Sequence, residues 1–174
     1  VFKILKTGSG FLIFVNSTVA KKLKKHLEKY AVFFKTKLEF IDNAINGIEI
    51  IPLSDWKLEC IEKGFVEINE SISEAFTPHE LNYQNLGLIS FEKGCFTGQE
   101  VIARMHYRGK LKFSLAKFSI NDENFLKEQD YVFNKDGKKL GQVVSEERNK
   151  GLITFKDKSA VKKELFDKNL KRIK

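Results

Sequence analysis

Residues Leu140–Phe155, LGQVVSEERNKGLITF, decide the fold of the C-terminal part of the chain. Leu140–Ser145 alternates apolar and polar side chains, and Gly151–Phe155 is a second apolar run that follows a turn at Asn149–Gly151. Alternation with a period of two is typical of a strand with one buried face, and a glycine-containing turn joins two such strands. The stretch therefore predicts a pair of antiparallel strands.

The same pattern extends on the N-terminal side of this pair. Phe113–Ile120 and Asp130–Phe133 also alternate, and Asn134–Gly137 has the composition of a turn. Several short strands at regular spacing favour a small antiparallel β-barrel. The change of pattern near Tyr107–Lys112 predicts two domains, residues 1–108 and 109–174.

The N-terminal region has the pattern of an α+β layer. Phe2–Lys6 and Phe11–Val15 flank a glycine turn and predict a β-hairpin. Asn16 or Ser17 is suited to cap a helix through about Tyr30, and Lys35–Ile41 is predicted to return as a strand. The order β-β-α-β fits an α+β sandwich. The apolar stripe expected on the helix comprises Val19, Leu23, His26, Leu27 and Tyr30.

The remaining predicted elements are short. The first two are a strand at Ile48–Ile51 and a helix Asp55–Lys63, which Ser54 caps and Gly64 ends. Two further helices are predicted from Thr77 to about Gly87 and from Gly98 to about His106, the second with Val101, Ile102 and Met105 facing inward. A helical tail is predicted within Lys162–Lys174. Thr77 with Glu80, and Thr97 with Glu100, have the spacing of capping boxes.

Composition limits the class of protein. The chain of 174 residues is 42% hydrophobic and 12% aromatic, so it can build a core and is no disordered tail. No apolar run approaches the roughly 18 residues of a membrane span. Two distant cysteines, Cys60 and Cys95, indicate a reducing compartment and not a disulfide framework.

The net charge of +8 is unevenly distributed. Residues 1–40 contain nine lysines against two glutamates, whereas residues 41–92 contain two lysines against ten carboxylates. Basic surface of this kind attracts polyanions such as RNA, although a lysine-rich solvated face has the same composition.

Cys95 is the strongest candidate for a reactive residue. It lies between Gly94 and Gly98, close to Lys93 and just before a predicted helix. A nearby positive charge and a helix N-terminus favour a thiolate, and flanking glycines permit close approach of a ligand. A buried, inert thiol is the alternative.

Other sites have weaker signals. The three histidines give no convincing partner for Cys95, because His79 is expected to be solvated and His26 to lie on the apolar stripe. His106 is near Cys95 in sequence but would lie about two and a half helical turns from the loop. No metal-binding spacing and no nucleotide-binding glycine loop occurs, so no metal is expected. Trp56 offers a surface on which a pterin could stack, and Glu62 a carboxylate for its N–C–NH2 edge, although a core tryptophan and a surface glutamate are the default.

A longer constellation resembles a known family. Phe76-Thr77-Pro78, Leu86–Phe91, the octapeptide KGCFTGQE at Lys93–Glu100, Ala103-Arg104 and Arg108-Gly109 are similar to the signature of the YgfZ-type folate-binding proteins, relatives of the glycine-cleavage aminomethyltransferase. The segment from Trp56 to Phe65 resembles their W…IExGF element, with Trp56 and Glu62 at its folate-contacting positions.

The resemblance implies both a fold and a role. The fold is α+β: a partial folate-binding, aminomethyltransferase-like α/β domain, whose N-terminal part would lie upstream of Val1 and whose middle is shortened, followed by a small C-terminal antiparallel β-barrel. The role is that of a tetrahydrofolate-binding factor that supports iron–sulfur cluster assembly or repair and thereby tRNA modification. Cys95 is then the essential thiol, and the motif residues around it are Lys93, Gly94, Gly98, Gln99, Glu100 and Arg104.

The resemblance leaves alternatives open. Cys95 would serve as a redox thiol, a transient cluster ligand or a carbon acceptor. The chain would otherwise be a folate-dependent one-carbon transferase, or a module that binds tRNA directly. The expected partners are iron–sulfur proteins or assembly factors, with weak tRNA contact through the lysine-rich faces and no membrane. The expected location is the bacterial cytoplasm, with the mitochondrial matrix as the alternative.

Overall fold

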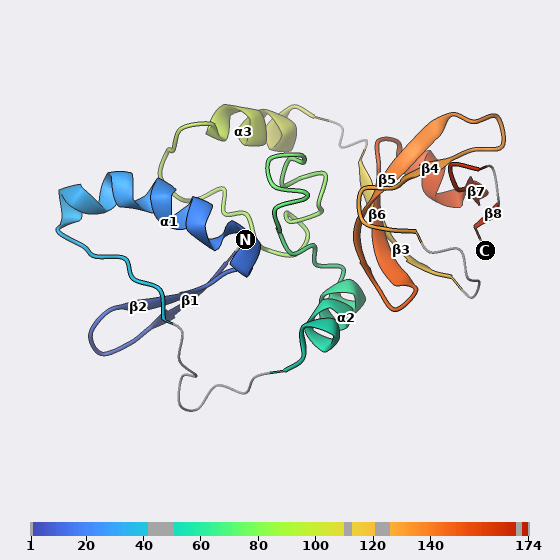
Figure 1. Ribbon diagram of the computed structural model, residues 1–174. Coiled ribbons are helices and arrows are strands. Elements are labelled where there is room, and N and C mark those ends of the chain that lie inside the picture. Colours follow the sequence, from blue (N-terminus) through green and yellow to red (C-terminus); the bar gives the residue numbers. More distant parts are fainter. Residues whose placement is uncertain (1, 42–50, 110–112, 121–125, 170–171, 174) are drawn as a thin grey trace. The chain divides into compact units, whose positions relative to one another are not determined.

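The computed structural model describes residues 2–41, 51–109, 113–120, 126–169 and 172–173 (Figure 1). The chain mixes helix and sheet, as the sequence predicts. It divides into two compact units, one formed by Val1–Pro52 with Glu67–Ser73 and the other by Leu53–Val66 with Glu74–Lys174. The boundary predicted between residues 108 and 109 stays a prediction.

The first unit contains the predicted hairpin and helix. Strands β1 (Lys3–Lys6) and β2 (Phe11–Phe14) pair antiparallel, and Thr7 N donates to the Gly10 carbonyl at 2.9 Å to close the turn. Helix α1 (Ser17–Ala31) follows, and the Asn16 side chain accepts a hydrogen bond from Thr18 N at 3.1 Å. Both the hairpin and the asparagine cap are therefore confirmed.

The strand predicted at Lys35–Ile41 is wrong. After α1 a short 3-10 helix, η1 (Val32–Phe34), ends at Lys35, whose φ of 51° reverses the chain, and residues 36–41 have no regular secondary structure. Most of the strand predicted at Ile48–Ile51 lies outside the described residues. The apolar stripe also differs: His26 and Tyr30 are exposed and contact each other, with ring centroids 5.4 Å apart.

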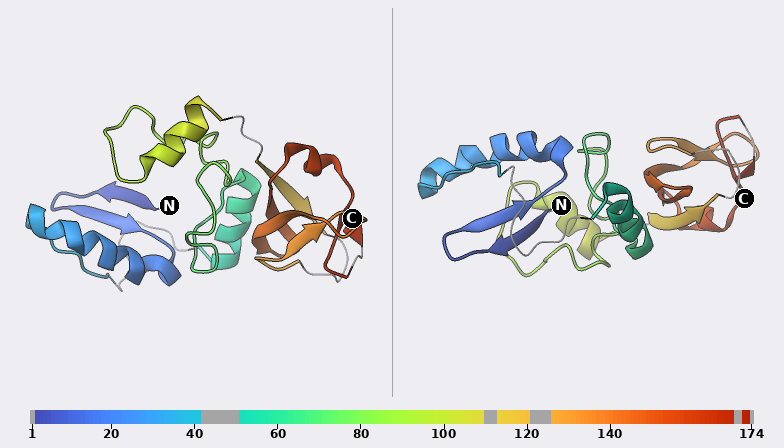
Figure 2. Two further views of the ribbon diagram at one scale, coloured as in Figure 1. Left: turned by 90° about the horizontal axis from the view of Figure 1, so that it is seen from above. Right: turned by 60° about the horizontal axis from the view of Figure 1, so that its bottom comes forward.

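The second unit is built on a curled antiparallel sheet (Figure 2). Its strands are β3 (Ser114–Ser119), β4 (Tyr131–Phe133), β5 (Lys139–Glu147), β6 (Lys150–Phe155), β7 (Leu165–Phe166) and β8 (Arg172–Ile173), in the spatial order β3-β6-β5-β4-β7-β8. Among the described residues no pairing joins β3 to β8, so the sheet that they form is open, and its closure into the predicted barrel stays a prediction. The buried core comprises Ile120, Leu126, Val132, Val143, Ile153, Phe155 and Ala160.

Strands β5 and β6 confirm the deciding hairpin with two local differences. The turn consists of Arg148 and Asn149, both at positive φ (48° and 63°), so it begins one residue earlier than predicted. Two successive residues at positive φ match the right-handed twist of a tight hairpin. The pairing also shifts at Val144, where a bulge lets two successive valines be buried and interrupts the predicted alternation.

The tail does not form the predicted helix. A 3-10 helix, η2 (Lys158–Lys162), precedes β7, and Phe166 pairs with Phe133 of β4. Leu165 packs against the core of the sheet. Burial of this side chain in a strand overrides the local preference for helix.

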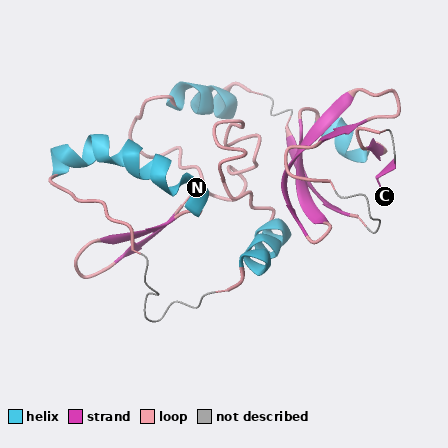
Figure 3. Ribbon diagram, viewed as in Figure 1, coloured by secondary structure: helices cyan, strands magenta, loops and turns pink. Residues whose placement is uncertain are grey.

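Helix α2 (Leu53–Lys63) ends as predicted at Gly64, where φ is 69° and Phe65 N donates to the Cys60 carbonyl at 2.8 Å. It begins two residues before the predicted start and contacts β5 and β6. A long stretch of loops and turns then leads to α3 (Gln99–Tyr107), as Figure 3 shows.

The helix predicted from Thr77 to Gly87 is wrong, although its start has the expected chemistry. Thr77 N donates to Glu80 Oε2 at 2.8 Å, and Glu80 N donates to Thr77 Oγ1 at 3.4 Å, which is a capping box. Asn82 then adopts a φ of 62°, and the residues that follow form successive turns. A left-handed residue breaks the helical hydrogen-bond ladder one turn after its start.

Candidate functional site

The candidate site is the loop that leads into α3. Helix α3 begins at Gln99, one residue later than predicted, and Gly98 caps it with a φ of 90° and no side-chain hydrogen bond. The capping box expected from Thr97 and Glu100 is therefore absent. The positive φ at Gly98 explains why glycine is favoured at this position, since other residues are strained there.

Cys95 is exposed in this loop, so the alternative of a buried, inert thiol is excluded for it. Lys93 Nζ lies 4.4 Å from the centroid of the Phe96 ring, within cation–π range. This contact joins the residues on either side of Gly94 and Cys95. It keeps a positive charge on the loop that presents the thiol to solvent.

The other motif residues lie on the first turns of α3. Gln99 is half-buried, whereas Glu100 and Arg104 are exposed. Arg104 lines a pocket of about 230 Å³ together with Ala103, Tyr107 and Arg108. On the same helix, Ile102 and Met105 are partly buried as expected, but Val101 is 56% exposed and does not face inward. The roles assigned to the motif residues stay predictions.

A cluster of aromatic and histidine rings fixes the far end of α3. Phe91 and His106 stack with ring centroids 3.6 Å apart, and the rings of His106 and Tyr107 meet in a T-shaped arrangement with centroids 4.7 Å apart. The His79 and Phe91 ring centroids are 6.4 Å apart. His79 is 5% exposed, so the expectation that it is solvated is wrong. Neither ring nitrogen of His79 has a hydrogen-bond partner among the described residues. Burial, and secondly the nearby His106, lower the pKa of His79 below its ordinary value of 6.5.

Sequence patterns did not reveal this cluster. His79, Phe91 and His106 are far apart in the chain, and no periodic signal links them. The apolar run Leu88–Phe91 was the one local indication that this segment packs against something. Their proximity follows from the turns at residues 77–87, which replace the expected helix.

Trp56 and Glu62, the residues expected to contact folate, both lie on α2. Trp56 is half-buried and Glu62 is exposed. The Glu62 carboxylate lies 3.4 Å from Lys150 Nζ, and the backbone carbonyl of Glu62 accepts a hydrogen bond from Lys117 Nζ. Six residues along an α-helix correspond to a rotation of about 240°, so the two side chains leave α2 on different sides. The folate role of this pair stays a prediction.

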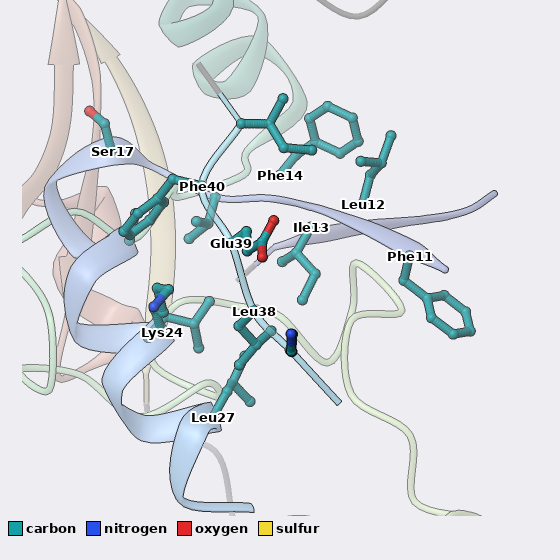
Figure 4. A pocket seen from close by; sticks show the side chains of 15 residues that line it. Phe11, Leu12, Ile13, Phe14, Ser17, Lys24, Leu27, Leu38, Glu39 and Phe40 are labelled. Carbon is teal, nitrogen blue, oxygen red and sulfur yellow. The ribbon is translucent and has the colours of Figure 1, made fainter. Parts of the chain in front are cut away.

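A larger pocket of about 380 Å³ lies within the first unit, between the hairpin, α1 and residues 37–41 (Figure 4). Its lining is mostly apolar and includes Ile13, Leu27 and Leu38, with Lys24, Lys37 and Glu39 as charged groups. Lys24 pairs with Glu28 and lies 5.7 Å from the Phe40 ring centroid. None of the predicted site residues lines this pocket.

The described residues contain neither a metal-binding cluster nor a membrane-spanning helix. No group of three or more histidine, cysteine, aspartate or glutamate side chains there is arranged to hold a metal ion. No helix of that part of the chain is long and apolar enough to cross a membrane.

Comparison with known proteins identifies relatives that share part of this chain. Proteins from Escherichia coli strains SE11 and SMS-3-5 and from Shigella boydii serotype 18 are each named tRNA-modifying protein YgfZ, and each is 48% identical over 67 residues. The resemblance to the YgfZ family is confirmed. The match covers 38% of this chain and 21% of the length of each of these YgfZ relatives. No protein-family profile matches the chain.

Proposed function

We propose that this chain is part of a tRNA-modifying protein of the YgfZ kind. In this proposal the Cys95 thiol supports the iron–sulfur proteins on which tRNA modification depends. The observation that carries it is the exposure of Cys95 in the KGCFTGQE loop. Support also comes from the name of the relatives that share 48% identity over 67 residues. A thiol at the surface can reach a protein partner, which a thiol in the core cannot.

The fold and location belong to the same proposal. Residues 1–108 correspond to the partial aminomethyltransferase-like domain, and the curled sheet corresponds to the C-terminal barrel domain. The bacterial cytoplasm is the proposed location, since the relatives named above are bacterial.

Tetrahydrofolate is the proposed cofactor. When bound, it would carry one-carbon units. Glu62 fits an edge contact, because its exposed carboxylate can accept hydrogen bonds from an N–C–NH2 group. Trp56 leaves α2 on another side and offers a separate, half-buried ring surface. If tetrahydrofolate stacks on Trp56, the only tryptophan, titration of tetrahydrofolate into the chain should change the fluorescence of that residue. A Glu62→Gln variant should bind more weakly with its helical content unchanged.

Genetic complementation tests the role of the thiol. A strain that lacks the gene is supplied with the wild-type protein, a Cys95→Ser variant or a Cys60→Ala control, and the activity of an iron–sulfur enzyme is measured. Cys60 is buried on α2, so its variant controls for loss of a thiol as such. We expect Cys95→Ser to lose most of the restored activity and Cys60→Ala to retain it. Full restoration by Cys95→Ser would remove the thiol from the mechanism.

A further inference from the structure

Two of the four arginines in this chain have no carboxylate partner among the described residues. Arg148 lies 3.2 Å from Asp55, and Arg172 lies 2.7 Å from Glu164. Arg104 and Arg108 are exposed and form no ion pair with any described residue, Glu100 included. A guanidinium group without a carboxylate neighbour keeps its five donors available for an external anion.

The two arginines are spaced to act together. Arg108 follows the last residue of α3, and its backbone N–H donates to the Arg104 carbonyl at 3.0 Å. Residues four apart on a helix lie on the same face, so both side chains leave α3 on one side. Their position at the C-terminal end of the helix also suits positive charge. The pair therefore places two adjacent cationic groups on one surface.

Tyr107 and Ala103 complete the surface. Together with Arg104 and Arg108 they line the pocket of about 230 Å³. Tyr107 is 70% exposed, and its ring is supported at one side by the edge contact with His106, which in turn stacks on Phe91. An aromatic ring that is held in place yet largely open to solvent is a platform on which a planar group can stack.

We propose that Arg104, Tyr107 and Arg108 form a binding site for single-stranded RNA. An unpaired base stacks on Tyr107, and the two guanidinium groups bind the adjacent phosphates. This combination of stacking ring and flanking cations is how proteins recognise single strands, whereas a duplex keeps its bases stacked inside. The choice of RNA as the polymer rests on the proposed function. The site itself rests on the geometry of α3.

Fluorescence anisotropy tests the stacking contact. The probe is a labelled, unpaired oligoribonucleotide of about 12 nucleotides, titrated with the full 174-residue chain. Tyr107→Ala should weaken binding roughly 5- to 150-fold, and Tyr107→Phe should bind within about twofold of wild type because it keeps the ring. Unchanged affinity of Tyr107→Ala, or equal loss in both variants, would overturn the proposal.

Salt dependence tests the phosphate contacts. Substitution of Arg104→Gln and Arg108→Gln should make the log–log slope of affinity against salt less steep by about 0.7 each. Arg148→Gln is the matched control, since Arg148 already pairs with Asp55, and its slope should stay near that of wild type. A triple variant of the exposed α1 lysines Lys21, Lys25 and Lys29 tests the competing surface. If that variant abolishes binding while the two arginine variants retain it, the proposed site is excluded.

Competition separates this proposal from the proposed function. An unlabelled single strand should displace the probe, and a perfectly paired RNA duplex of equal length should displace it far less. Equal competition by the duplex would exclude base stacking on Tyr107. The Cys95 variants report on the proposed function independently, because they leave the three residues of this site unchanged.

Discussion

Phe91 and His106 stack on each other, with ring centroids 3.6 Å apart and planes 17° from parallel. Phe91 precedes the Lys93–Gly98 loop, and His106 lies in the last turn of α3. The stack therefore holds together the two ends of the segment that contains Cys95. The exposed Cys95 thiol therefore lies in a loop whose two flanking segments are held by Phe91 and His106.

Removal of the stack should loosen this segment. We expect Phe91→Ala to lower the free energy of unfolding by about 1–3 kcal/mol, from lost burial and the lost ring pair. Urea unfolding followed by circular dichroism measures the change. Phe96→Ala is the control, since Phe96 is 42% exposed and its loss should cost less. If both variants are equally stable, the Phe91–His106 stack does not stabilise this segment as we expect.

The two cysteines should differ in reactivity. Iodoacetamide should label Cys95 in the native protein, because it is exposed, and should label Cys60 on unfolding, because it is 4% exposed. Peptide mass spectrometry quantifies each site. Labelling of Cys60 at the rate of Cys95 in native buffer would contradict the structure.

The stability of the second unit should depend on pH through His79. Its pKa is lowered in the folded state, mainly by burial, so the unfolded state binds the proton more readily. Stability should therefore be full at pH values well above 6.5 and should fall as the pH falls through that ordinary value. Urea midpoints measured from about pH 8 to pH 5.5 test this dependence.

A ring without a titratable group provides the comparison. His79→Phe should show a shallower decrease in midpoint over the same range than the wild-type protein. Identical pH profiles for wild type and His79→Phe would contradict the assignment.

Elements with strong local signals could be predicted from the sequence. The β1–β2 hairpin, the asparagine cap of α1, the glycine end of α2 and the β5–β6 hairpin formed because turn residues, caps and periodicity agree there. The helix at residues 77–87 did not form, even though its capping box did, because Asn82 adopts a left-handed conformation. Leu165 joined a strand because burial against the sheet outweighs its local preference.

The candidate site was predictable only in part. The glycine-flanked loop signalled Cys95, and its exposure matches that expectation. The contacts that define its surroundings could not be read from the sequence, since Lys93 meets Phe96 and His106 meets Phe91 through the backbone course of an irregular segment. Trp56 and Glu62 were paired by likeness to other proteins, and a helix of 3.6 residues per turn directs them to different sides.

Close packing at Gly151 should make that position intolerant of a side chain. A Cβ there would meet the Ser145 carbonyl and the ring of Phe118. We expect Gly151→Ala to destabilise the protein by about 1–3 kcal/mol. Gly8→Ala is the matched control, because a Cβ at Gly8 meets nothing within 4 Å. Thermal unfolding compares the two, and equal melting temperatures would show that the sheet relaxes around the added methyl group.

In the proposed function, the Cys95 thiol is required for tRNA modification. The most direct test of this requirement is mass spectrometry of nucleosides from total tRNA, in cells whose chromosomal gene encodes the wild-type protein, Cys95→Ser or Cys60→Ala. We predict that Cys95→Ser lowers the abundance of a modified nucleoside toward the level of a deletion strain, whereas Cys60→Ala leaves it near wild type. A Cys95→Ser strain with a wild-type nucleoside profile would contradict the claim.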